Sequence, residues 1–176
     1  MFRISQYMRE LAHAEQTGHY PEVRERKARG PVVIWNLIRR CNLTCKHCYA
    51  LSADHDYVGE LTLPEVFTVM DDLKGFGVPA LILSGGEPLL RPDIFEISAQ
   101  ARKLGFYTGL STNGTLIDRP LAQRIAQEGF DYVGISLDGL KPTHDKFRRL
   151  DGAFDRSLAA VRFLDEFVVK VGLRFT

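Results

Sequence analysis

The sequence of 176 residues lacks the long apolar run that a membrane-spanning helix requires, since such a helix takes roughly 20 consecutive apolar residues. Its first fifteen residues also lack the continuous apolar core of a secretory signal peptide, because Arg3, Arg9 and Glu10 interrupt them. The two absences predict a cytoplasmic protein with no membrane partner.

An excess of charge of either sign is missing as well. The chain has 23 Lys and Arg residues against 22 Asp and Glu residues, which gives a formal net charge of +1. No field of the whole chain would therefore attract nucleic acid. With 45% hydrophobic and 26% charged residues, the sequence has the composition of an ordinary globular domain that recognises its partners through local sites.

Cysteine is scarce, and all of it lies in one short segment. Cys41, Cys45 and Cys48 are the only three cysteines of the chain. An odd number at such close spacing does not make a disulfide framework and indicates a metal site in a reducing compartment. Iron–sulfur clusters use thiolate ligands, and four irons held by three thiolates leave one iron open for another ligand. An open iron is a reaction site.

The alternative is a zinc site in which His47 is the fourth ligand. His47 directly precedes Cys48, and tetrahedral ligation by two adjacent residues is awkward. Zinc-binding chains also usually bring a second pair of ligands from farther along the sequence. The spacing therefore favours the cluster over zinc, and over three free buried cysteines.

Strand and helix signals alternate along the rest of the chain. Apolar, β-rich runs begin near Val32, Ala80, Phe106, Tyr132 and Val168. Helix signals lie between them, at about residues 62–73, 92–105, 118–129 and 154–167. This order predicts an α/β fold with a parallel sheet. We expect residues 1–30 to form an N-terminal helix and a basic connector (24–29), and residues 31–176 to form the core.

Three further motifs come directly after predicted strands. They are the Gly-Gly-Glu-Pro segment 85–88, the Ser-Thr-Asn-Gly segment 111–114 and the Ser-Leu-Asp-Gly segment 136–139. Each alone is typical of a simple turn. Together with the cysteines, however, they fall at the carboxyl ends of successive parallel strands, where α/β proteins place their ligand sites. The sequence therefore predicts one active site at this edge.

The cysteine triplet followed by Gly85-Gly86-Glu87-Pro88 resembles the signature of the radical S-adenosylmethionine (SAM) superfamily, and the resemblance covers about residues 32–176. It implies a partial (βα)6 barrel of the TIM-like type, truncated here after about five strands. It also implies that Cys41, Cys45 and Cys48 bind three irons of a [4Fe-4S] cluster, while SAM chelates the fourth. The enzyme would cleave SAM reductively to a 5'-deoxyadenosyl radical.

The same resemblance implies the residues that bind SAM. His47 would approach the adenine, and Gly85, Gly86 and Glu87 would meet the methionine amino group. The remaining contacts, to ribose and carboxylate, would come from Ser111, Thr112, Asn113, Ser136 and Asp138.

Within the superfamily, the segments 35–49, 59–61 and 67–73 resemble the NirJ-type proteins of haem d1 biosynthesis. The implied substrate is a tetrapyrrole, didecarboxysirohaem, whose propionates are replaced by oxo groups, and the implied reductant is a flavodoxin or ferredoxin. Enzymes of the alternative haem pathway and of peptide modification share much of the pattern. Those relatives usually have further cysteines, and this chain has none after Cys48.

Other charged residues admit two interpretations each. Arg39 and Arg40 would favour ionisation of the first thiol, or one of them would be a surface residue. The segment with His144, Asp145 and Arg148 is expected in a loop that lies either near the active site or on the surface. A hypothesis from a different class is that the truncated chain is a non-catalytic module that binds a metal or a partner.

Overall fold

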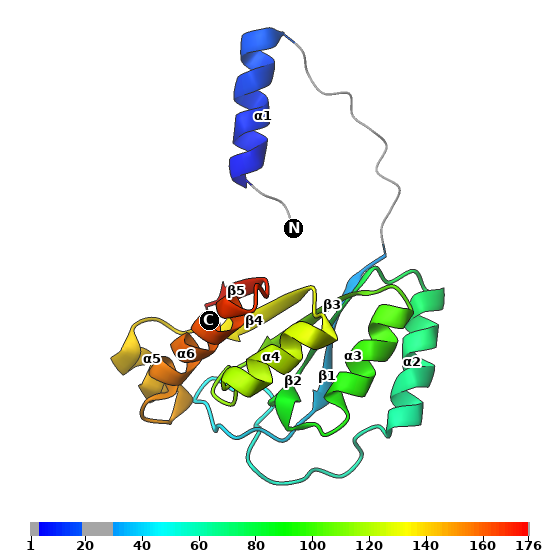
Figure 1. The fold of residues 1–176 in the computed structure, drawn as a ribbon, viewed down its shortest axis with the longest axis vertical. Coiled ribbons are helices and arrows are strands. Elements are labelled where there is room, and N and C mark those ends of the chain that lie inside the picture. The colour runs from blue at the N-terminus through cyan, green and yellow to red at the C-terminus, as the bar shows by residue number, and fades with distance from the viewer. Residues whose placement is uncertain (1–3, 19–29, 176) are drawn as a thin grey trace.

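The computed structural model describes residues 4–18 and 30–175 (Figure 1). Helix α1 spans Ile4–Thr17. The basic connector predicted at 24–29 lies outside the described residues. Within the part that is described, no helix combines the length and the apolar character that crossing a bilayer requires.

A single parallel sheet of five strands forms the centre of the fold. The strands are β1 (Val32–Ile38), β2 (Ala80–Gly85), β3 (Tyr107–Thr112), β4 (Tyr132–Ser136) and β5 (Val171–Arg174). Their order in the sheet is their order in the sequence, and every neighbouring pair is parallel. The predicted α/β fold with a parallel sheet is confirmed.

Helices connect the strands. They are α2 (Leu63–Gly75), the short 3-10 helix η1 (Pro88–Leu90), α3 (Ile94–Lys103), α4 (Arg119–Glu128), α5 (Lys141–Arg148) and α6 (Ala153–Glu166). The four helices predicted at 62–73, 92–105, 118–129 and 154–167 correspond to α2, α3, α4 and α6. The loop predicted around His144 is wrong, because residues 141–148 form α5.

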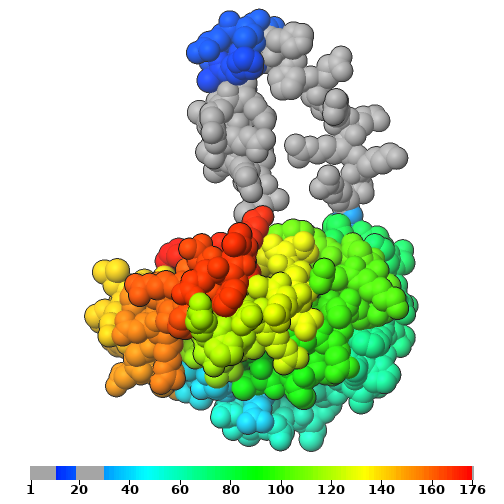
Figure 2. Space-filling model, in the orientation of Figure 1, coloured from blue at the N-terminus to red at the C-terminus, as the bar shows by residue number. Residues whose placement is uncertain are grey.

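The sequential strand order determines the architecture. Each crossover from one parallel strand to the next has the same hand, so consecutive strands place their helices on the same face of the sheet. Figure 1 shows α2, α3, α4 and α6 side by side over that face, and Figure 2 shows the same face in space-filling form, with the green of α2 and α3 on one side and the orange of α6 on the other. A sheet covered on one face in this way is a partial barrel, in contrast to a doubly wound sheet, which has helices on both faces.

Local chemistry sets the helix ends. At the start of α2, Glu65 accepts a hydrogen bond from the main-chain N–H of Thr62 at 2.8 Å, as in a capping box. At the start of α4, Asp118 accepts from the N–H of Leu121 at 2.8 Å. The same helix ends at Gly129, whose φ of 70° is one that glycine adopts without strain. β5 begins at Val171, three residues later than predicted, because Val168 lies in a turn with φ of 59°.

The hydrophobic core lies between the sheet and the helices. Alternate strand residues such as Leu81, Leu110 and Val133 are fully buried and belong to the same cluster as Ile125 of α4 and Leu164 of α6. The intervening strand residues point to the other, concave face. There the register pairs Asn36 with Ser84, and Ser136 with Arg174. The concave face is therefore polar near the carboxyl ends of the strands, and the helix-covered face is apolar.

Because Leu164 is fully buried in this core, Leu164→Ala should lower the free energy of unfolding by about 2 to 5 kcal/mol. Urea denaturation followed by circular dichroism measures the change. Leu140→Ala is the matched control, since Leu140 is 78% exposed and its truncation should have a much smaller effect. Equal losses in the two variants would contradict this assignment of the core.

Candidate active site

The three cysteines line one cavity at the carboxyl edge of the sheet. They follow β1 and form no disulfide, and Cys41 is buried while Cys45 and Cys48 are half-buried. The cavity has a volume of about 360 Å³. Its other lining residues come from all five strands and from the segments after them: Ile34, Leu43, His47, Tyr49, Ala50, Ser52, Ser84, Gly85, Gly86, Ser111, Thr112, Asn113, Ser136, Arg148 and Arg174.

The turn after β2 packs its main chain directly against the start of the cysteine segment. The N–H of Gly86 donates to the carbonyl of Ile38 at 2.6 Å, and the N–H of Glu87 donates to the carbonyl of Arg40 at 2.9 Å. A Cβ added to Gly85 would collide with Ile38, and one added to Gly86 would collide with the main chain of Arg40. Both glycines are therefore required for this approach, which holds Cys41 beside the turn.

Glu87 is fully buried, and its carboxylate fastens the β2 turn to the turn after β3. It accepts hydrogen bonds from the Thr112 hydroxyl at 2.7 Å, the Asn113 N–H at 2.9 Å and the Leu89 N–H at 3.2 Å. Burial raises the pKa of Glu87 to about 7, although these three donors oppose the shift. The side chain is not among those that line the cavity. Glu87 therefore joins the two turns from inside the protein.

A network of side-chain amides connects the Ser-Thr-Asn-Gly motif (111–114) to the cysteine segment. The Asn113 side chain donates to the side-chain oxygen of Asn42 at 3.0 Å and to the sulfur of Cys41 at 3.9 Å. Its own oxygen accepts from the N–H and the hydroxyl of Thr115 at 2.8 and 2.7 Å. Asn42 donates to the same hydroxyl at 2.9 Å. Cys41 is thus fixed from the β2 side and from the β3 side.

The Ser-Leu-Asp-Gly motif (136–139) contributes Asp138, which is buried and forms an ion pair with Arg148 of α5. A terminal nitrogen of Arg148 donates to Oδ1 of Asp138 at 3.1 Å, and Nε of Arg148 lies 2.7 Å from Oδ2 of the same carboxylate as an ion pair. Arg148 also donates to the sulfur of Cys45 at 3.7 Å. In the same helix, the main-chain carbonyl of Phe147 accepts from the N–H of Lys46 at 2.8 Å. Helix α5 therefore supports the middle of the cysteine segment.

Two histidines flank Asp138. Nε2 of His47 lies 3.8 Å from the Asp138 carboxylate, and its Nδ1 is buried without a hydrogen-bond partner. His144 is almost fully buried, and burial first and then Arg148 lower its pKa, which favours the neutral ring. Nδ1 of His144 accepts the main-chain N–H of Asp138 at 3.1 Å. His144 supports Asp138, whereas His47 lines the cavity.

The thiols differ in their electrostatic surroundings. Burial raises the pKa of Cys41 to about 11. Burial also raises the pKa of Cys45, with Arg148 opposing the shift. At Cys48 burial acts in the same sense, but main-chain N–H groups, among them that of Ser52, outweigh it and lower the pKa. A bound cation would favour the thiolate at all three positions, because it supplies the positive charge that burial removes.

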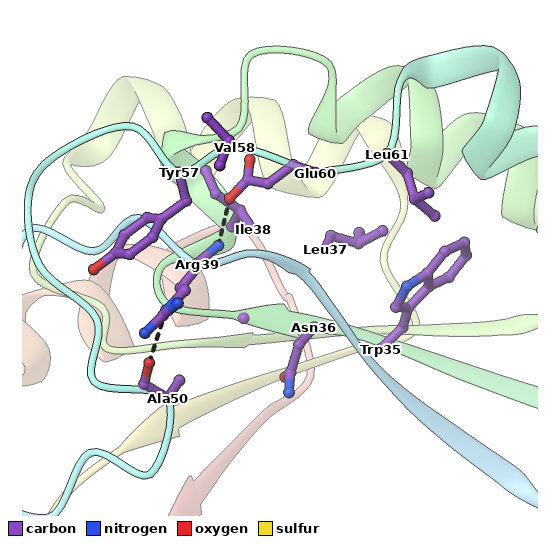
Figure 3. Close-up of a pocket in the computed structure, with 12 residues that line it drawn as sticks. Trp35, Asn36, Leu37, Ile38, Arg39, Ala50, Tyr57, Val58, Glu60 and Leu61 are labelled. Atoms are coloured by element: carbon purple, nitrogen blue, oxygen red, sulfur yellow. Dashed lines mark hydrogen bonds between the residues drawn. The ribbon is translucent and has the colours of Figure 1, made fainter.

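Arg39 and Arg40 do not act as expected on the first thiol. Arg40 pairs with Asp54 at 2.7 Å and Asp56 at 3.0 Å, and neither arginine is among the main influences on the pKa of Cys41, which are burial, the N–H of Leu43 and nearby acidic groups. The N–H of Arg39 donates to Glu60 at 2.7 Å, and its guanidinium donates to the Ala50 carbonyl at 3.0 Å. Figure 3 shows this arrangement beside a second cavity of about 400 Å³. Arg39 ties the end of β1 to the loop that follows the cysteines.

The structure brings most of the predicted site residues to one cavity. Those that line it are Cys41, Cys45, Cys48, His47, Gly85, Gly86, Ser111, Thr112, Asn113 and Ser136. Glu87 and Asp138 lie behind it, where each fixes a neighbouring element. Arg174 was missed, although the alternation of β5 residues, with Arg174 in register with Ser136, is a signal that points to the concave face.

Comparison with known proteins identifies the family. The model of the radical SAM superfamily matches residues 35–174. The chain belongs to the radical SAM superfamily. The resemblance carried by the cysteine and Gly-Gly-Glu-Pro motifs is thereby confirmed.

The curated relatives are longer than this chain. The chain is 52% identical over 179 residues to the pre-heme d1 synthase of Dinoroseobacter shibae, a match that covers 100% of the chain and 42% of that protein. It is 49% identical over 150 residues to the Fe-coproporphyrin III synthase of Methanosarcina barkeri, covering 85% of the chain and 38% of that protein. The chain thus spans about two-fifths of the length of these relatives.

Solved structures of proteins with bound AdoMet share the fold. The structure of native anSMEcpe with bound AdoMet has a TM-score of 0.66 and 26% identity, over 81% of this chain and 42% of that one. The structure of Streptococcus suis SuiB bound to S-adenosylmethionine has a TM-score of 0.71 and 17% identity, over 96% of this chain and 37% of that one. The second likeness concerns the fold alone.

The residues present fit the cluster and the SAM that the superfamily implies. The three thiols have no disulfide partner and line one cavity, and the two glycines leave the main chain open to a ligand. In residues 4–18 and 30–175, no group of three or more His, Cys, Asp or Glu side chains is arranged to hold a metal ion. A four-iron cluster does not need convergence on one ion, because each thiolate binds a different iron.

If the glycine contact positions the cysteine segment, Gly86→Ala should displace it and lower the iron and sulfide retained after anoxic reconstitution by at least about half, since an added Cβ has no room. Gly75→Ala is the matched control, because nothing lies within 4 Å of a Cβ at Gly75. Chemical analysis of iron and sulfide measures the outcome. Full retention in the Gly86 variant would contradict the proposed contact.

The raised pKa of Glu87 makes stability depend on pH. Between the ordinary value of 4.5 and about 7, unfolding releases a proton from Glu87, so the wild type loses stability as pH rises through this window. Relative to the wild type, Glu87→Gln should gain about 2 to 4 kcal/mol of unfolding free energy across the window. Urea denaturation at several pH values measures it.

Glu96→Gln, which changes an exposed carboxylate of α3, is the control for this experiment. Its unfolding free energy should follow that of the wild type across the same pH range. A constant difference between Glu87→Gln and the wild type would show that the buried carboxyl does not change its protonation in the window.

Proposed function

We propose that this chain holds a [4Fe-4S] cluster through Cys41, Cys45 and Cys48 and binds SAM at the iron that no cysteine ligates. The observation that carries the proposal is that three unpaired thiols, a close-packed Gly-Gly turn and the polar ends of β3 and β4 line a single cavity. When bound, the cluster and SAM would supply a one-electron reductive cleavage that gives methionine and a 5'-deoxyadenosyl radical.

The protein residues would bind and orient SAM. The main chain at Gly85 and Gly86 is open to the methionine amino group, because neither residue has a side chain to cover it. The hydroxyls of Ser111 and Ser136 face the cavity, where they can bond ribose or carboxylate oxygens. His47 presents a ring for stacking on the adenine.

Buried groups would keep this arrangement rigid. Glu87 holds the turn after β2 on the turn after β3, and the contact it was expected to make with the amino group stays a prediction. Asp138 acts through Arg148, whose guanidinium lies against Cys45. A hydrogen bond to a ligating sulfur draws electron density from it and favours the reduced state of a cluster. Arg148 would therefore ease entry of the electron.

We further propose that the substrate is an iron tetrapyrrole. The support is that the relatives include a pre-heme d1 synthase, an Fe-coproporphyrin III synthase and AdoMet-dependent heme synthases. The 52% identity to the first favours the haem d1 reaction, in which propionates of didecarboxysirohaem are replaced by oxo groups. The 49% identity to the second favours the alternative haem pathway as the other candidate.

The remaining components follow from the chemistry. The electron would come from a low-potential carrier such as a flavodoxin or ferredoxin. We place the protein in the cytoplasm, where thiols are kept reduced and free to ligate a cluster. Neither nucleic acid nor a membrane is part of the proposed reaction.

Anoxic reconstitution with iron and sulfide should give a brown protein whose visible absorption is bleached by dithionite. With SAM and reductant it should release 5'-deoxyadenosine, which liquid chromatography detects. Cys45→Ala should lower this product at least about a hundredfold, because one cluster ligand is lost. Colourless protein with one zinc per chain would refute the proposal, and an intact cluster without SAM cleavage would favour a non-catalytic module.

A further inference from the structure

We propose that Arg174 is a specificity-determining residue that binds a carboxylate of the substrate inside the cavity. The inference rests on the proposed function and adds to it the side chain that recognises the substrate. Arg174 is the last residue of β5, and it lines the same cavity as the three cysteines.

The position of the guanidinium is fixed from the sheet. Arg174 is in register with Ser136, so both side chains point to the concave face. One of its terminal nitrogens donates to the hydroxyl of Ser111. Its main-chain carbonyl accepts from the N–H of Leu137 at 2.7 Å, which anchors the end of β5 to β4. The guanidinium is thus preorganised above β3 and β4.

Glycine makes room for this arrangement. A Cβ added to Gly134 on β4 would lie 2.6 Å from Nε of Arg174, so the arginine lies against the bare main chain of the sheet. A Cβ added to Gly172 would collide with the ring of Tyr132. The glycines of β4 and β5 therefore let two large side chains lie flat on the concave face, and leave the cavity above them open.

The charge of Arg174 is not neutralised within the described residues, where no carboxylate forms an ion pair with it. The other arginine of the cavity differs, because Arg148 is paired with Asp138. A half-buried guanidinium that faces a cavity and bonds only a neutral hydroxyl is a site for an anion. A carboxylate fits it best, through two parallel hydrogen bonds.

Two carboxylates could enter this cavity, that of SAM and one on the substrate. The groups that hold the cysteine segment belong to the ends of β1, β2 and β3 and to α5, whereas Arg174 comes from β5 at the far end of the strand order. Although Arg174 bonds Ser111, whose hydroxyl can also bind SAM, its place on the last strand of the sheet, away from the strands that hold the iron-ligating segment, favours the substrate. A tetrapyrrole with propionate side chains provides such a carboxylate, and a neutral macrocycle does not.

The test compares an iron porphyrin that has two propionates, haemin, with its dimethyl ester. Binding of each to the reconstituted chain is followed by the change in porphyrin absorption, for the wild type, Arg174→Gln and Arg174→Lys. Arg174→Gln should weaken haemin binding about tenfold. Arg174→Lys should weaken it less, because an ammonium keeps the charge but cannot donate two parallel hydrogen bonds to a carboxylate. Ester binding should be the same in all three proteins.

Arg162→Gln is the matched control, since Arg162 is exposed on α6. It should bind both porphyrins as the wild type does. Unchanged ester binding by Arg174→Gln also shows that this variant is folded. Haemin affinity that does not change in Arg174→Gln, or ester affinity that falls equally, would overturn the proposal.

A second arm distinguishes the two sources of the carboxylate. The dissociation constant of SAM, measured by equilibrium dialysis with the reconstituted chain, should be the same for the wild type and Arg174→Gln. A tenfold loss of SAM affinity with no loss of haemin affinity would assign Arg174 to the cofactor and refute the inference. Failure of the proposed function looks different, because the wild type itself would then form no cluster or bind no SAM.

Discussion

The site depends on one close approach of main chain to main chain. The turn Gly85-Gly86 lies against residues 38–40, and two hydrogen bonds of 2.6 and 2.9 Å join them. Because neither turn residue has a Cβ, the cysteine segment can begin at the carboxyl edge of the sheet and cross in front of it. All three thiols then face the ends of the strands that supply the polar groups.

Buried charges and amides convert this approach into a rigid frame. Glu87 joins the turns after β2 and β3, Asn113 joins the third motif to the cysteine segment, and the Arg148–Asp138 pair joins α5 to Cys45. The polar groups of this network bind one another through hydrogen bonds and an ion pair, so few of them are left to bind a ligand. Among those that line the cavity are the thiols, the two strand-end serines, His47 and the guanidinium of Arg174. Their chemistry suits iron, the oxygens of SAM and a carboxylate.

The sequence was sufficient to predict the sheet, four of its helices and most of the cavity, because each of these has a local signal. The cysteine spacing, the capping box at Thr62 and the Gly-Gly turn are signals within a few residues. Helix α5 was missed because its burial comes in part from contacts that are remote in sequence, such as that of Arg148 with Cys45, 103 residues away. The contact of Glu87 with SAM stays a prediction, and its hydrogen bonds to Thr112 and Asn113 have no local signal, because these donors are 25 and 26 residues away. Arg174 was missed for the same reason, since Ser111, to which it donates a hydrogen bond, is 63 residues away.

The central claim is that three cysteines leave one iron of a four-iron cluster without a protein ligand. Mössbauer spectroscopy of the chain reconstituted with iron-57 tests it most directly, because the spectrum resolves iron sites that differ in coordination. The account predicts four irons per chain, with the parameters of one iron in four changing when SAM is added. A spectrum that SAM leaves unchanged, or irons that are all equivalent in its presence, would contradict the account.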